Sequence, residues 1–363
     1  VNKLVAAFSD ALKTMKEVDS ELVTIQKTTG YSGEQLDRLT ESAYKLASAY
    51  GRTATEILNA ASVYARAGFK DNLEDMTELS ALLQNVGDLT GEAAAKFLVA
   101  TNAAWQMNGS YENLLRVIDG LNQQTNEAAV DMNALTSGIT VAGSVFSNAG
   151  ESVQTFAGLL GAGVALTQRS GSEIGRGLRT IAMNIRQIKG ELDDGEIIDE
   201  ASISDAAAAL HSVGISVADA NGELRLTSDV LTDLAGKWGS LTTAEQSYLS
   251  QSLAGKRQAN ILNALMNNWQ EVERQMTLYA NGAGSAMKEN EIYLDSWEAK
   301  TKQLNAAWTE FVANLVDTDL IKRALDGLIA LVNLLDSDFG HFLITAIAIP
   351  TVLLTIASIA AKL

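Results

Sequence analysis

Histidine and cysteine, the side chains that most often carry catalysis or bind metals, are scarce in this chain. Its 363 residues include no cysteine and two histidines, His211 and His341. Paired-histidine metal motifs and thiolate sites are therefore impossible, and a Ser-His-Asp triad would need one of these two residues. His211 stands in an alanine-rich stretch and His341 precedes an apolar run, so we expect structural or solvent-facing roles. We predict no catalytic, cofactor-binding or metal-binding residue, and no enzymatic activity.

Three further segments contain parts of ligand-binding motifs without completing them. The glycine-rich run 158–177 lacks a Gly-Lys-Ser/Thr ending, so it is not a phosphate loop. The segment Asp219-Ala-Asn-Gly222 lacks the later glutamate of a calcium loop, and a turn explains it better. The acidic run 191–200 is best interpreted as a solvated loop. Within 158–163, the glycines interrupt an apolar run, which would let helices approach closely.

Composition favours long helices and excludes one class of partner. Pro350 is the single proline, and 28 glycines provide the breaks between helices. The net charge of −17 excludes binding to a phosphate backbone through counterion release, so we expect no direct, sequence-specific nucleic-acid binding. The sequence starts at Val1 and not at Met, which we interpret as a piece of a longer protein.

Apolar residues recur at three- and four-residue steps along most of the chain, which predicts an all-α fold. We expect a multi-helix bundle with long amphipathic helices and a C-terminal hydrophobic helix. One small β-hairpin is predicted near 215–226, around Asn221-Gly222. Four segments have the pattern of a capping box, which begins a helix. They begin at Ser32, Thr53, Ser170 and Thr242.

These patterns divide the chain into four parts. We predict an amphipathic helix over 1–29, a helical core domain over 30–282, long coiled-coil-like helices over 283–337 and a hydrophobic segment over 338–363. Within the core, helices are expected at 243–253 and 256–280, and a long one follows from about 285 to 316.

The long helix carries apolar side chains at alternating steps of three and four residues, which is a heptad pattern. We call these residues the seam: Leu294, Trp297, Leu304, Trp308, Phe311 and Leu315. Thr301 fills the one gap. The seam can pack on the bundle of its own chain or form an inter-chain coiled coil. Tryptophan is bulky for a two-stranded coil, which favours intramolecular packing or a wider bundle.

The chain ends with an apolar stretch of membrane-spanning length. Residues 342–361 contain no charge and would span about 30 Å as a helix. The predicted membrane-inserting residues are Phe342, Leu343, Ile344, Ile347, Ile349, Pro350, Val352, Leu353, Leu354, Ile356 and Ile359. The alternative is a helix buried in an oligomer's core or along a protein tube.

Three ordered groups of segments resemble the core region of tape measure proteins of lactococcal-type siphophages and many prophages. The first group is 44–51 with 60–68, and the second is 142–150 with 157–161 and 172–180. The third is 214–217 with 221–225, 231–235 and 253–262. The resemblance covers about residues 1–280. The long coiled-coil ruler that is typical of such proteins is missing from this chain.

The resemblance implies a structural role. Such a protein sets tail tube length during virion assembly and, on infection, leaves the tail and helps DNA cross the host membrane. Implied partners are the tail tube protein, tail assembly chaperones, distal tail and baseplate hub proteins, further copies as a trimer or hexamer in the tail lumen, and the host membrane. Implied locations are the virion, the host cytoplasm and the host membrane. The alternatives are a pore-forming helical toxin with one membrane-inserting helix and a membrane-anchored wall hydrolase.

Overall fold

The computed structural model describes residues 2–69, 72–191 and 197–315. The chain divides into two compact units. One unit consists of Val1–Met15 with Trp308–Leu363, and the other, which we call the main unit, is Lys16–Ala307. Each unit is described by itself below.

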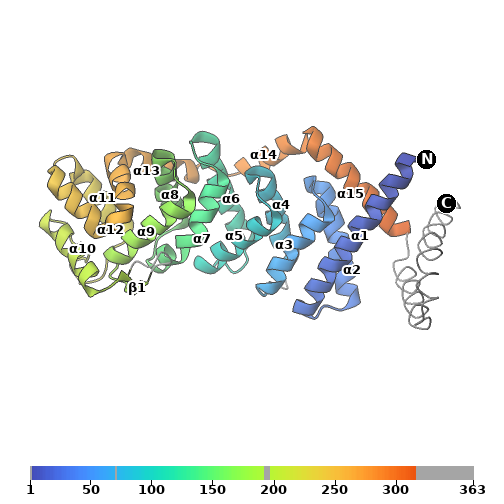
Figure 1. Ribbon diagram of the computed structural model, residues 1–363, viewed down its shortest axis with the longest axis horizontal. Coiled ribbons are helices and arrows are strands. Elements are labelled where there is room, and N and C mark those ends of the chain that lie inside the picture. The colour runs from blue at the N-terminus through green and yellow to red at the C-terminus, as the bar shows by residue number, and fades with distance from the viewer. Residues whose placement is uncertain (1, 70–71, 192–196, 316–363) are drawn as a thin grey trace, which may run out of the picture. The chain divides into compact units, whose positions relative to one another are not determined.

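Nearly all of the described chain is helical, which confirms the all-α prediction (Figure 1). The helices are α1 (Asn2–Thr29), α2 (Gly33–Tyr50), α3 (Ala54–Arg66), α4 (Leu73–Gly87), α5 (Gly91–Ala104), α6 (Tyr111–Glu127), α7 (Met132–Asn148), α8 (Val153–Thr167), α9 (Gly171–Ile185), α10 (Glu200–Ser212), α11 (Thr227–Trp238), α12 (Thr243–Asn267), α13 (Trp269–Ala280), α14 (Ser285–Leu294) and α15 (Trp297–Leu315). Two short strands, β1 (Gly190–Glu191) and β2 (Ile197–Ile198), pair antiparallel.

Local side-chain chemistry determines where several helices begin. In a capping box, a hydroxyl accepts a hydrogen bond from the third helical N–H, and the side chain at that position accepts one in return. Complete boxes begin α2, α3 and α12, formed by Ser32 with Gln35, Thr53 with Glu56 and Thr242 with Glu245. At α9, Ser170 Oγ accepts from Glu173 N at 3.3 Å. All four predicted helix starts are confirmed.

Helices α2–α9 form a two-layered row in the main unit, which we call the forward row (Figure 1). Each helix contacts the next helix and the next but one, so even-numbered helices make one layer and odd-numbered helices the other. The core follows the row, and its largest side chains include Tyr64 of α3, Phe97 of α5, Phe146 of α7 and Phe156 of α8. The rings of Phe146 and Phe156 stack with centroids 4.4 Å apart.

Glycines bring α8 close to its neighbours, as the sequence predicts. A Cβ added at Gly163 would lie 2.5 Å from Ile174 Cγ2 of α9. A Cβ added at Gly158 would lie 2.3 Å from Met276 Cγ of α13, and one at Gly161 would lie 2.8 Å from an oxygen of Gln275. Real Cβ atoms do not approach so closely, so α8 needs these glycines to pack in this way.

After α10 and α11, the chain turns back along the row. Helix α12 contacts α8 and α9, α13 contacts α8 and α6, and α14 contacts α6 and α4. We call α13 and α14, Trp269–Leu294, the return segment. It crosses the even-numbered layer in the direction opposite to the chain order of that layer (Figure 1). The return segment therefore joins helices that are far apart in the sequence.

The reversal takes place inside α12, at Gly255. This residue has φ 69° and ψ 167°, a combination that only glycine adopts without strain. Ser250 Oγ donates to Asn263 Oδ1 at 2.7 Å, although thirteen positions along a straight helix span about 20 Å. The two halves of α12 therefore fold back on each other. From the neighbouring helix α9, Asn184 Nδ2 donates a hydrogen bond to the Leu253 carbonyl at 2.9 Å. This backbone acceptor near the break at Gly255 therefore has a partner.

Three predictions about elements need correction. The hairpin near 215–226 is wrong, because Ala218 and Leu224 form only one isolated bridge. Two backbone hydrogen bonds flank this bridge, from Asp219 N to the Glu223 carbonyl at 2.8 Å and from Arg225 N to the Val217 carbonyl at 2.9 Å. Asp219 Oδ1 accepts from the N–H groups of Asn221 and Glu223, so a side chain takes up the donors nearest the turn. The predicted helix 256–280 breaks at Asn268, and the predicted long helix from 285 breaks after Leu294.

The smaller unit is described for Asn2–Met15 of α1 and for the end of α15 from Trp308 to Leu315. Ala11, Met15 and Val312 are buried together, with Phe8 and Leu12 packed against them. Trp308 Nε1 donates to the Ala7 carbonyl at 3.2 Å. Across the part of the chain that the structure describes, no helix is both long enough and apolar enough to cross a bilayer. The predicted C-terminal hydrophobic helix and its membrane-inserting residues lie outside that part.

Candidate functional surfaces

The seam is the group of residues that the sequence singles out most clearly, and much of it faces solvent. Trp297 is 88% exposed, Leu304 is 69% exposed and Phe311 is 53% exposed. Leu294 and Trp308 are half-buried, while the side chain of Leu315 lies outside the described part. The seven-residue spacing of the three exposed residues puts them on the same side of α15.

The other side of α15 carries small residues that do pack. In the main unit, Ala299 and Ala306 are buried, and a Cβ added at Gly51, the C-cap of α2, would lie 3.0 Å from Ala299 Cβ. Within the main unit, α15 therefore packs through its alanines. The side chains of Trp297 and Leu304 are left largely exposed by the described residues. The inter-chain coiled coil stays a prediction.

Charges along α15 are balanced, in contrast to the rest of this acidic chain. Lys302 Nζ lies 2.9 Å from Glu298 Oε1, and Lys300 Nζ lies 3.9 Å from Asp295 Oδ1. Lys302 is half-buried and the other three side chains are exposed, so each pair contributes little to stability. Their effect is to leave the surroundings of Trp297 without net charge. A helix of this kind can approach a copy of itself without strong repulsion.

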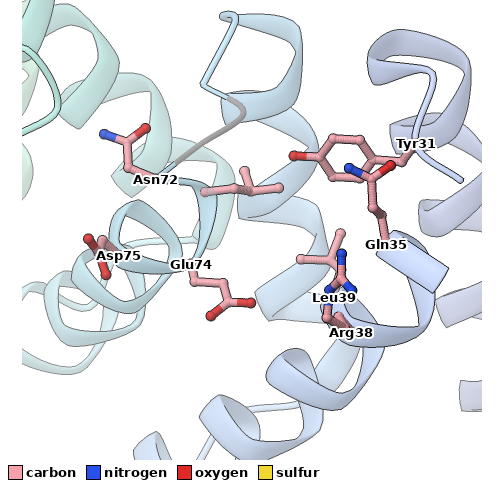
Figure 2. Close-up of a pocket in the computed structure, with 8 residues that line it drawn as sticks. Tyr31, Gln35, Arg38, Leu39, Asn72, Glu74 and Asp75 are labelled. Atoms are coloured by element: carbon pink, nitrogen blue, oxygen red, sulfur yellow. The ribbon is translucent and has the colours of Figure 1, made fainter.

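A cavity of about 390 Å³ lies between the N-terminal ends of α2 and α4 (Figure 2). Figure 2 shows Gln35 and Arg38 on the α2 side across from Glu74 on the α4 side, while the Asn72 amide points away from them and donates to the Gly109 carbonyl at 3.0 Å. The complete lining is Tyr31, Gln35, Arg38, Leu39, Asn72, Leu73, Glu74 and Asp75. This set mixes both charges and includes no histidine or cysteine. It offers contacts for a polar group but no evident nucleophile or metal ligand set.

Two buried carboxylates have structural partners that account for them. Glu151, which is 3% exposed, accepts from Ser228 N at 2.7 Å and from Ser228 Oγ at 2.9 Å, and so caps the start of α11. Burial raises the pKa of Glu151, while these two hydrogen bonds act in the opposite direction. Asp119 of α6 accepts from Gly284 N and Ala286 N, and so caps α14. Neither carboxylate lines the cavity between α2 and α4.

Within the described ranges, no group of three or more histidine, cysteine, aspartate or glutamate side chains is arranged to hold a metal ion. His211 is exposed on α10, and His341 lies outside those ranges. These observations do not test for activity, so the expectation of no enzymatic function stays a prediction.

Sequence reasoning missed the hydrogen bonds that hold the return segment on the forward row. Gln124 with Gln275 and Asn85 with Asn290 are amide pairs whose members are separated by 151 and 205 positions. Periodicity identifies apolar faces, but it cannot pair polar residues across such separations. The one available signal was a polar residue at a position of α4, α6, α13 or α14 where an apolar residue would continue the buried face of the helix.

Comparison with known proteins identifies the family. A family model described as phage-related minor tail protein matches residues 40–255, which is more than half of the chain. A protein of Escherichia phage P2 described as a probable tape measure protein is 23% identical over 251 residues, which are 68% of this chain and 29% of that relative. The chain thus spans under a third of the relative's length. No solved structure matches.

The matched range contains α3–α11 whole, together with most of α2 and the first half of α12. It therefore includes nearly all of the forward row and stops before the return segment begins. Together with the helical architecture, the extent of this match leads to one conclusion: the chain belongs to the phage-related minor tail protein family.

Proposed function

We propose that this chain is part of a tape measure protein, which sets the length of the phage tail tube and leaves the tail during infection. The observation that carries the proposal is the family match over 40–255, and the similarity to a probable tape measure protein supports it. The matched segment is a folded row of helices, so we assign it an assembly role. The ruler itself would lie in sequence beyond this chain.

The proposal includes a homo-oligomer, a trimer or hexamer in the tail lumen, whose copies meet along the seam of α15. Exposure of Trp297 and Leu304 beside balanced charges supports that contact. The proposed partners are the tail tube protein, tail assembly chaperones and distal tail or baseplate hub proteins. The acidic surface, with a chain charge of −17, suits a protein that shares a tube with DNA without binding it.

Delivery of DNA across the host membrane is the second part of the proposed role. It rests on the uncharged run 342–361, which lies outside the described part of the chain. The alternative of a pore-forming toxin does not explain the match to a tail protein family, so we favour the virion role.

The deciding experiment compares two in-frame deletions in the phage gene, with tail length measured by electron microscopy. Removal of heptad-rich sequence outside this chain should shorten the tail in proportion to the residues lost, since a helix rises about 1.5 Å per residue. Removal of α6 and α7, 111–148, should prevent tails from forming, because it cuts the forward row. Normal tails from the second deletion, or unchanged length from the first, would refute the proposal.

A further inference from the structure

The return segment buries few large apolar side chains against the forward row and many polar ones. The buried side chains of α13 are Val272 and Gln275, and those of α14 are Ala286 and Asn290. Of these four, only the valine is a sizeable apolar group. Met276 and Tyr279 also pack over Gly158 and Gly120, and burial of the Tyr279 ring raises the pKa of its hydroxyl. By contrast, α4 buries four leucines, a methionine and a valine. Burial of apolar surface therefore holds α4 in place much more firmly than it holds the return segment.

Amide pairs take the central positions of this interface. Gln124 Nε2 of α6 donates to Gln275 Oε1 at 2.9 Å, and Asn85 Nδ2 of α4 donates to Asn290 Oδ1 at 2.6 Å. At the edge, Asn126 Nδ2 donates to Glu289 Oε2 at 2.8 Å. Water offers equivalent partners to each of these groups once they are exposed, so breaking such pairs costs far less than exposing a core of the same size.

Two acceptors beneath the return segment work against its attachment. The side-chain oxygens of Asn122 and Gln124 are buried without a hydrogen-bond partner among the described residues. Both residues contact the return segment, since Asn122 Nδ2 donates to Ser285 Oγ and Gln124 donates to Gln275. A buried acceptor without a partner loses its hydration. Water would restore that hydration if the segment moved away, which lowers the cost of opening.

Asp119 provides a buried charged contact and ties α14 to the row. Its two carboxylate oxygens accept from Gly284 N at 2.9 Å and Ala286 N at 3.1 Å, and its carbonyl accepts from Ser285 Oγ. Helix α14 has no side-chain cap of its own at Gly284. The first turn of α14 therefore depends on a carboxylate that belongs to α6, so helix formation and docking are coupled there.

From these contacts we propose that the return segment is a detachable clamp, which lifts from α4, α6 and α8 as one unit while the forward row stays folded. The two helices move together because Asp119 holds the turn that links them. Lifting uncovers the glycine-lined faces of α6 and α8 at Gly120, Gly158 and Gly161. This proposal concerns the fold alone and does not depend on the proposed function.

Hydrogen exchange of the whole chain, followed by mass spectrometry, tests the clamp. Amides of α13 and α14 should share one exchange rate, about tenfold or more faster than the rate in α7 and α9, because opening needs no loss of the core. Asp119→Asn should raise the rate of α13 and α14 further and leave α7 and α9 unchanged. Equal protection of all four helices, or a uniform loss of protection in the variant, would overturn the proposal.

Glu151→Gln is the matched control, since Glu151 is also a buried carboxylate that caps a helix from another element. It should speed exchange in α11 but not in α13 or α14.

A covalent tie gives a second test in a chain that has no cysteine of its own. The variant Asn126→Cys with Glu289→Cys, joined by a short bismaleimide, should slow α13 and α14 to the rate of α7. Glu289→Cys alone should not. Fast exchange in the tied protein would mean that the helices unwind in place, which contradicts a clamp.

Discussion

The side-chain amide of Asn85 donates to the side-chain oxygen of Asn290 across 2.6 Å, although 205 positions separate the two residues. Asn85 uses its second amide hydrogen on the Tyr50 carbonyl and accepts from Arg52 Nε. Asn85 and its three partners are all buried in the main unit. Asn85 is therefore the point where α4, the end of α2 and the return segment are joined.

Truncation of Asn290 should destabilise the protein measurably. Asn290→Ala leaves one buried amide hydrogen of Asn85 without an acceptor, which should lower the free energy of unfolding in urea by about 1–3 kcal/mol. Asn281→Ala, at an exposed asparagine in the same region, should change it by less than about 0.5 kcal/mol. Equal effects of the two substitutions would show that the amide pair contributes nothing specific.

Alanine substitutions at two glycines, Gly255 and Gly236, should have opposite effects on the stability of the fold. Gly255→Ala puts a Cβ on a residue with φ 69° and should destabilise the fold by about 1–3 kcal/mol. Gly236→Ala lies in the helix α11, where an added Cβ meets nothing within 4 Å, and should stabilise by about 0.5–1 kcal/mol. Thermal unfolding of both variants beside the wild type measures the difference. A stabilising Gly255→Ala would mean that α12 does not turn back there.

Glu151 should make stability depend on pH in the acid range. Its pKa is raised in the folded chain, so the native state binds more protons than the unfolded state between the ordinary glutamate pKa, about 4.3, and the higher native value. The free energy of unfolding therefore falls as pH rises through that window. Glu151→Gln removes this titration. The stability of the variant relative to the wild type should rise with pH across the window, and a constant difference in urea titrations would contradict the raised pKa.

The exposed part of the seam gives a prediction about self-association. Trp297→Ser with Leu304→Ser should weaken association of the chain by about a hundredfold or more, since burial of each large side chain is worth about 1.5–3 kcal/mol. Sedimentation equilibrium measures the effect. Tyr248→Ser, which removes a 47% exposed side chain from α12, is the control and should leave association unchanged. If the double variant associates like the wild type, the copies meet elsewhere.

The proposed role in DNA delivery depends on the apolar run near the end of the chain. Ile349→Asp with Leu354→Asp in the phage protein should leave tail length normal and reduce infection, because a charge at mid-bilayer depth costs about 2.5–3.5 kcal/mol. Ile349→Val with Leu354→Val keeps the run apolar and should infect normally. Full infectivity of the aspartate variant would count against entry of this segment into a membrane.

Local features were predictable from the sequence because each depends on residues a few positions apart. The capping boxes at Ser32, Thr53 and Thr242 and the close approach at Gly158 all follow from neighbours along the chain or from one apolar run. The predicted strands around Asn221 failed for a local reason as well. The carboxylate of Asp219 takes two backbone N–H groups, and an alternating pattern does not reveal that competition.

Long-range features were not predictable, because they depend on which helices meet. The seam pattern of Trp297 and Leu304 describes an apolar side of α15 without saying what covers it. In the structure, the alanines at 299 and 306 make the intramolecular contact, and an alanine face gives a weak periodic signal. The path of the return segment over α6 is likewise fixed by Gln275 and Asp119, which periodicity treats as surface residues.

The break at Gly255 inside α12 also limits where related chains can differ in length. The break at Gly255 is one residue long, and one insertion in the following half-helix would rotate everything beyond it by about 100°. Ile261, which meets Gly177 of α9, would then point away from its contact. The turn at Gly222 has open space around it and can lengthen freely. We therefore expect gaps in alignments of related tail proteins to gather near Gly222 and to avoid Gly255, which makes that glycine a reliable anchor for comparing distant sequences.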